Sequence, residues 1–161
     1  MSRPFRLLFP ALLILALLLP GCSPQEEKPE QQVKVAKAPQ RVIVPESVQG
    51  KWKAVKISVL DKETRKEVAY TVDIGAAFRV GGGQLQVKVE NFLPAFVMDG
   101  TTMTSASNLT RNPAAQIVIS EDGKELYRGW LFSLYPSAHA YQHPRYSFSL
   151  VDFVPARVKK G

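Results

Sequence analysis

This chain of 161 residues has a single cysteine, and its central region has little net charge. A single cysteine allows no internal disulfide, so the folded part needs a sufficient apolar core of its own. Residues 51–154 carry 12 basic and 10 acidic side chains, and most of the formal net charge of +7 therefore lies nearer the two ends. A near-neutral central region provides no basic face, which excludes nucleic-acid binding as the function.

Long apolar runs are also few, and the one that stands out covers residues 7–19. Arg3 and Arg6 precede the run, and Pro10 interrupts it. At a helical rise of about 1.5 Å per residue, a run of this length is too short for the roughly 30 Å of hydrocarbon in a bilayer. A basic start followed by a short apolar run is typical of a secretory signal. We therefore predict that residues 1–21 are a cleaved signal peptide.

The only cysteine follows this run directly, in the order Leu19, Pro20, Gly21, Cys22. A leucine three positions before a cysteine, with a small residue just before it, resembles the bacterial lipobox. The resemblance implies cleavage before Cys22, diacylglycerol on its thiol, and fatty acylation, for example by palmitate. Ser23 at the next position implies sorting to the outer membrane, with the protein facing the periplasm. The alternative is an ordinary secreted protein with a chance cysteine.

The region after the cysteine has no aromatic residue. Residues 23–50 contain four acidic residues, four basic residues and four prolines. Such a composition cannot bury enough apolar surface to offset the entropy lost on ordering. We expect residues 22–50 to be a flexible, lipid-anchored linker, in which Val42, Ile43 and Val44 alone suit an edge strand. Residues 155–161 form a basic tail.

Residues 51–154 hold 13 of the 15 aromatic residues and alternate apolar with polar side chains, most clearly at residues 55–59. Asp61 begins a polar turn, and Asp122 followed by Gly123 is a strong hairpin signal. No helix-period segment exceeds about two turns. The pattern predicts one all-β domain, a small sandwich or barrel of about six or seven short antiparallel strands.

Two stretches interrupt the alternation. Residues 93–113 read as one long connection, and connections of this length in a compact domain are uncommon and often functional. Residues 136–142 begin at Pro136 and end shortly before Pro144. The two prolines suit the first position and the stop of a helix, so we predict one short helical turn there.

Residues 129–132 read Gly-Trp-Leu-Phe, and residues 143–146 read His-Pro-Arg-Tyr. In this order and spacing they resemble the G-W-x-F and H-P-x-Y elements of a proteobacterial envelope lipoprotein family known only as a domain of unknown function. The resemblance covers most of residues 53–154 and implies no activity. Ser147 and Phe153 stand where family members often have aspartate and cysteine, so no role of that acid or thiol is implied here.

His139 and His143 are four positions apart, so they would share one face of the expected helical turn and both could bind one metal ion. A third ligand would have to come from Asp99, Asp152 or a linker carboxylate. Alternatively, His139 lies at the surface and the ring of His143 packs or hydrogen-bonds to fix the turn before Pro144. We expect neither a metal nor a cofactor, and a metal-binding protein or metal-dependent enzyme using the two histidines is the alternative function.

No activated nucleophile and no pair of carboxylates stands out, so we expect no enzyme. The leading hypothesis is a lipid-anchored envelope protein that binds a protein or cell-wall partner. The predicted contact surface combines Phe96, Met98 and Met103 of the long connection with His143 and Tyr146 of the later turn. A structural module whose function is anchoring itself is a third reading.

Overall fold

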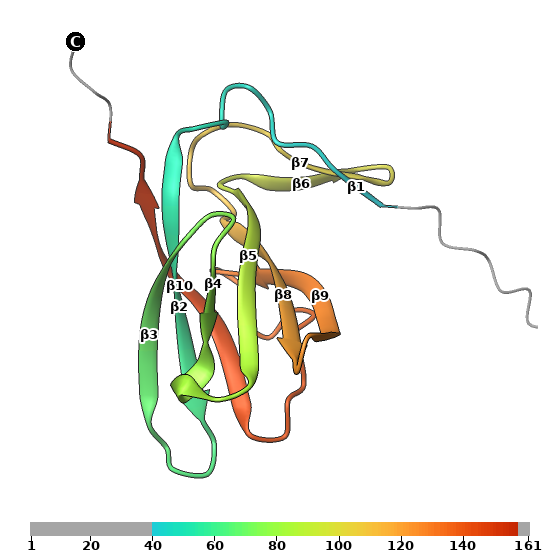
Figure 1. Ribbon diagram of the computed structural model, residues 1–161. Coiled ribbons are helices and arrows are strands. Elements are labelled where there is room, and N and C mark those ends of the chain that lie inside the picture. Colours follow the sequence, from blue (N-terminus) through green and yellow to red (C-terminus); the bar gives the residue numbers. More distant parts are fainter. Residues whose placement is uncertain (1–39, 158–161) are drawn as a thin grey trace, which may run out of the picture. The chain divides into compact units, whose positions relative to one another are not determined.

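The computed structural model describes residues 40–157 (Figure 1). These residues form ten strands and one short 3-10 helix, so the predicted all-β class is confirmed. No helix in this part of the chain is long and apolar enough to cross a membrane. The predicted signal peptide and Cys22 lie outside the described residues, as do most of the predicted linker and the end of the basic tail.

Two antiparallel sheets form the body of the domain, with strand orders β10-β2-β3 and β4-β5-β8-β9. The first sheet consists of β2 (Trp52–Asp61), β3 (Glu67–Asp73) and β10 (Tyr146–Pro155). The second sheet consists of β4 (Ala77–Arg79), β5 (Leu85–Leu93), β8 (Ala114–Glu121) and β9 (Lys124–Phe132). The 3-10 helix, Val80–Gly82, joins β4 to β5.

The two sheets face each other across one apolar core, to which strands of both sheets contribute. Alternate residues of a strand point to the same face. Val55 and Ile57 of β2 are therefore both fully buried, and so are Val87 of β5 and Ile117 of β8. Because the core lies between two separate sheets, the domain is a sandwich, which decides between the two architectures that the sequence left open.

The turns follow the local sequence. The Oδ1 atom of Asp61 accepts the backbone N–H groups of Glu63 and Thr64 at 3.0 and 3.1 Å, which fixes the turn between β2 and β3. Asp122 and Gly123 have positive φ angles of 50° and 79°, as a two-residue hairpin between β8 and β9 requires. Short-range signals were sufficient to predict both turns.

A third sheet lies across one end of the sandwich (Figure 1). We call this sheet the arm, and it consists of β1 (Arg41–Val42), β7 (Thr102–Ser105) and β6 (Phe96–Asp99), in that order. β1 is parallel to β7, whereas β6 and β7 form an antiparallel hairpin that turns at Gly100, where φ is +57°. The interpretation of residues 93–113 as one long connection is therefore wrong, because a hairpin occupies its centre.

The fold also begins before residue 51. Val42 pairs with Met103, and Val48 is almost fully buried. The last part of the predicted linker therefore belongs to the domain. β1, β4, β6 and β7 are two to four residues long, too short for alternation to reveal. Residues 40–157 therefore contain ten strands where the sequence predicted six or seven.

Residues 133–145 connect β9 to β10, and we call them the crossover segment. The helical turn predicted for residues 136–142 is absent. Residues 136–139 instead form a turn in which the Ala138 N–H donates to the Tyr135 carbonyl at 2.9 Å, and a φ of +53° at His139 ends it. The Tyr127 hydroxyl of β9 then donates to the His139 carbonyl at 2.8 Å. This tertiary contact outweighs the local proline signals.

Candidate functional site

A largely apolar hollow of about 510 Å³ lies between the arm, β9 and the crossover segment. We call it the arm groove. Its volume falls in the range of about 300–1,000 Å³ that is typical of ligand pockets in proteins. Its walls include Phe96, Met98 and Met103 of the arm, Trp130 and Phe132 of β9, and His139 of the crossover segment.

The strand register of the arm brings three of the predicted contact residues into this groove. Met98 and Met103 are paired across β6 and β7, and Phe96 lies two residues before Met98, so all three side chains share the inner face. The Phe96 ring meets Trp130 and Phe132 edge to face, with 5.0 Å between ring centroids in each pair. Phe96 thus holds the arm on β9, while Met98 remains 54% exposed at the groove.

Tyr127 supports the opposite wall of the groove, and sequence reasoning missed it. Its hydroxyl bonds the His139 carbonyl, and its ring stacks on Tyr141 with centroids 4.9 Å apart. Burial raises the pKa of Tyr127. The ring lies over Gly129, where an added Cβ would collide with the Tyr127 hydroxyl. A glycine two residues after an aromatic residue on one strand, as Gly129 is after Tyr127, was the signal that could have revealed the packing of the Tyr127 ring over Gly129.

Arg128 lines the groove without adding a free charge to it. Its Nη2 atom is 2.8 Å from Oε2 of Glu125, and the guanidinium also pairs with Glu90. The hydrogen bond with Glu125 raises the pKa of Arg128 and lowers the pKa of Glu125. Since two carboxylates neutralise this arginine, the groove favours a partner whose buried part is uncharged.

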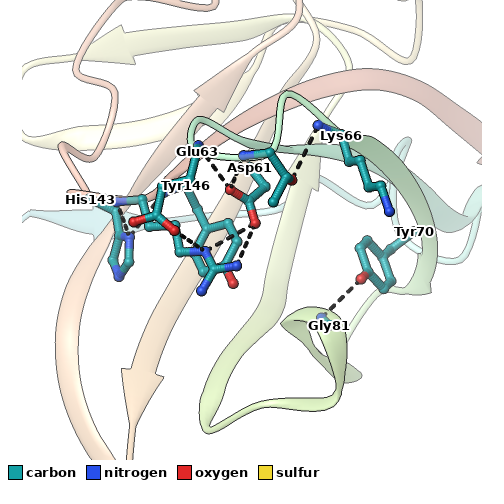
Figure 2. A network of polar contacts seen from close by, with 9 residues as sticks. Asp61, Glu63, Lys66, Tyr70, Gly81, His143 and Tyr146 are labelled. Atoms are coloured by element: carbon teal, nitrogen blue, oxygen red, sulfur yellow. Dashed lines mark hydrogen bonds and ion pairs between the residues drawn. The ribbon is translucent and has the colours of Figure 1, made fainter.

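His143 and Tyr146, the other two predicted contact residues, lie outside the groove. They belong to a polar cluster with Asp61, Lys62 and Arg145, which we call the Asp61 corner. Figure 2 shows Asp61, His143 and Tyr146 of this cluster. The Nη2 and Nε atoms of Arg145 donate to Oδ2 of Asp61 at 2.7 and 3.0 Å. The hydrogen bond from Arg145, helped by the backbone N–H groups of the turn, lowers the pKa of Asp61 to about 2. This charged pair joins the β2–β3 turn to the start of β10.

His143 fixes the end of the crossover segment through its ring. Nδ1 accepts the backbone N–H groups of Arg145 and Tyr146, each at 3.1 Å, and the ring stacks on Tyr146 with centroids 5.3 Å apart. The Lys62 Nζ donates to the His143 carbonyl at 2.7 Å. Partial burial lowers the pKa of His143. This is the turn-fixing role that we considered as the alternative to metal binding.

The premise of the metal alternative is not met, because His139 and His143 do not lie on a helix. Nδ1 of His143 is already a hydrogen-bond acceptor for two N–H groups. Among residues 40–157, no group of three or more His, Cys, Asp or Glu side chains is close enough to hold a metal ion. Asp152 instead pairs with Lys56 at 3.2 Å and accepts the N–H of Phe153.

Fold and site together define a small β-sandwich domain with an accessory arm and an apolar groove beneath it. A family model described as an uncharacterized protein conserved in bacteria, DUF2155, matches residues 55–152, and the chain belongs to this family. The resemblance to a bacterial domain of unknown function is thereby confirmed, whereas its lipoprotein and proteobacterial features stay predictions. No curated protein and no solved structure matches the chain.

Proposed function

We propose that this protein is a lipid-anchored, non-enzymatic binding domain of the bacterial cell envelope, whose partner occupies the arm groove. The arm groove itself carries the proposal, because it combines Phe96, Met98 and Met103 with aromatic residues of β9 in one apolar hollow. The lipobox-like sequence at Cys22 and the bacterial family support the envelope location.

The lining of the groove suits an apolar segment of another envelope protein better than a glycan. Methionine side chains are flexible and polarizable, and they adapt to partners of different shape. The Met98 side chain is free to adapt because it is 54% exposed, whereas its cross-strand partner Met103 is only 7% exposed. Arg128 offers no unpaired charge to an ionic ligand.

The engagement of the polar groups also supports binding rather than catalysis. Asp61 and Arg145 bond each other, and Nδ1 of His143 accepts two backbone N–H groups. A general base needs a free lone pair directed at a substrate proton. The acceptor atoms of Asp61 and His143 instead hold the β2–β3 turn and the end of the crossover segment in place.

Photocrosslinking in cells tests the groove. A photoreactive amino acid at Met98 should give a defined adduct with an envelope protein, whereas the same residue at Val68, which is 50% exposed on β3, should not. An adduct with peptidoglycan would assign the cell-wall partner instead. No adduct at Met98, or equal adducts at both positions, contradicts the proposal.

The anchor needs a separate test. Cys22→Ser should abolish labelling by palmitate and make membrane association weak and reversible, so that washing the membrane fraction releases the protein, because stable anchoring needs two or three acyl chains. Density-gradient separation of the two membranes of the unchanged protein tests the outer-membrane location. Unaltered palmitate labelling, or membrane association of the Cys22→Ser variant that resists washing, would overturn the lipid anchor while leaving the groove untouched.

A further inference from the structure

The outer face of the arm, opposite the groove, exposes a row of aliphatic side chains. Val42 and Met103 point toward the sandwich, so their neighbours along the strands point away from it. On this outer face Val97 pairs with Thr104, whose hydroxyl donates to the Ile43 carbonyl at 2.8 Å. Ile43 is 52% exposed and Val97 is 39% exposed.

A third exposed aliphatic side chain lies beside Val97. Leu109 is 60% exposed and lines the same shallow hollow as Val97. Exposed single apolar residues are ordinary, but neighbouring ones on one face indicate a contact surface. We call Ile43, Val97 and Leu109 the aliphatic patch.

Two arginines flank the aliphatic patch. Arg41 precedes the inward-pointing Val42 on β1 and therefore points to the outer face, and Arg111 lines the hollow with Leu109. Within residues 40–157 neither guanidinium is paired with a carboxylate, in contrast to Arg128 and Arg145. Asp99 is a carboxylate on the same face of the arm, so the surface is amphipathic with a modest basic excess.

We propose that the outer face of the arm is a membrane-contact surface that rests on an anionic lipid leaflet. The aliphatic patch enters the boundary between headgroups and acyl chains, and Arg41 and Arg111 bind lipid phosphate groups. Both contributions are those that hold peripheral proteins on membranes, since apolar burial and attraction to anionic lipid act together. The arm groove, on the inner face, then stays accessible to a partner beside the membrane.

This inference rests on the proposed lipid anchor, because the anchor would bring the arm to the bilayer. Cys22 lies 18 positions before Gln40, the first described residue. A chain segment of that length spans at most about 60 Å. The acyl chains and the arm can therefore contact the same leaflet.

Vesicle binding by the mature chain carrying Cys22→Ser tests the surface without the anchor. The protein should sediment with vesicles of phosphatidylglycerol and phosphatidylethanolamine and much less with phosphatidylcholine. The triple variant Ile43→Ser, Val97→Ser, Leu109→Ser should lower the partition coefficient about tenfold. The double variant Arg41→Gln, Arg111→Gln should remove the preference for anionic vesicles.

Matched controls come from the sandwich. Val68→Ser replaces a 50% exposed valine of β3, and Arg79→Gln replaces an exposed arginine of β4, so both should leave vesicle binding unchanged. Thermal unfolding of every variant checks that the fold persists. Equal losses in the controls, or full vesicle binding by the triple variant, would overturn the proposal.

Self-association and the lipid anchor can each be told apart from membrane contact by the arm. If sedimentation velocity detects a dimer that the triple variant abolishes, with vesicle binding unchanged, the patch is a self-association surface and the membrane proposal fails. Palmitate labelling in cells tests the anchor at Cys22 alone. The vesicle assay tests the arm alone, because it contains no acylated protein. Failure of the anchor and failure of the membrane-contact surface are thus distinguishable.

Discussion

The arm and the Asp61 corner lie at opposite ends of the sandwich, and side-chain interactions of different kinds stabilise them (Figure 1). The inner face of the arm packs on β9 through apolar side chains, with Phe96 against Trp130 and Phe132. The corner is held by charge-assisted hydrogen bonds around Asp61 and Arg145. The apolar contact of the arm leaves a hollow in which another apolar surface can bind. The polar groups of the corner bond each other, so few of their donors and acceptors are left for a partner.

This difference also predicts how each end responds to its surroundings. Apolar packing is insensitive to pH and is not screened by salt. The ion pair of the corner is partly exposed, so salt screens it and acid protonates its carboxylate. Variants at the two ends should therefore differ in size of effect and in their dependence on pH.

The largest effect is expected when the arm loses its aromatic attachment. Phe96→Ala should lower the free energy of unfolding by about 2–3 kcal/mol, somewhat less than for a fully buried phenylalanine, because Phe96 is partly exposed. Denaturant unfolding measures the loss. Met98→Ala is the matched control on the same face, and as an exposed residue it should change stability by less than about 0.5 kcal/mol. Equal effects of the two substitutions would contradict an apolar attachment through Phe96.

Filling the space over Gly129 should have the next largest effect. Gly129→Ala places a Cβ where the Tyr127 hydroxyl lies, so the tyrosine must move and release the His139 carbonyl. We expect a loss of about 1–3 kcal/mol, as for overpacking elsewhere. Amide hydrogen exchange should rise in the crossover segment and not at the Asp61 corner. A double variant that also carries Tyr127→Ala should relieve the clash, and a failure to do so would exclude this cause.

At the corner, Asp61→Asn should lower the melting temperature less than Phe96→Ala does. It should also make the melting temperature depend less on pH in the acid range. Because the pKa of Asp61 is lowered to about 2 in the folded protein, the ionised form stabilises the fold above its usual pKa, and this contribution is lost as the pH falls from about 4 toward 2. Melting curves over this range should fall more steeply for the unchanged protein. Parallel curves would mean that the Arg145 pair contributes nothing to stability.

The smallest effect is expected at His143 near neutral pH. A pKa lowered in the folded state means that the neutral ring stabilises the fold fully above its usual pKa of about 6.5, and that stability declines as the pH falls below it. His143→Asn keeps an acceptor for the two N–H groups but cannot be protonated, so its melting temperature should change less between pH 7.5 and 5. His139→Asn is the matched histidine replacement, since asparagine tolerates the positive φ there.

The long strands and their turns were predictable because their signals are local. Val55 and Ile57 alternate with polar residues, and Asp61 and Gly123 carry their turn chemistry within a few positions. The arm was not predictable in this way. Its strand β1 has two residues and pairs with β7, about 60 positions later, so no local pattern reports the pairing.

The candidate site divides in the same manner. Phe96, Met98 and Met103 were recognised as one surface because they lie close in sequence. Tyr146 and His143 were assigned to the same surface only because both stretches looked irregular, and the structure places them at the Asp61 corner instead. The contact between Tyr127 and His139 decides which side of the crossover segment faces the groove. Because the Tyr127 hydroxyl bonds a backbone carbonyl, the identity of residue 139 does not reveal this contact.

By itself the sequence determined the all-β class and the principal turns, because the period of two and the turn residues act over a few positions. Only the tertiary structure decided that two sheets share one core, that the arm crosses one end of the sandwich, and that a groove lies beneath it. Those features depend on packing between residues far apart in the chain, such as Phe96 on Trp130. Such packing is a property of volumes and contacts that a linear pattern does not contain.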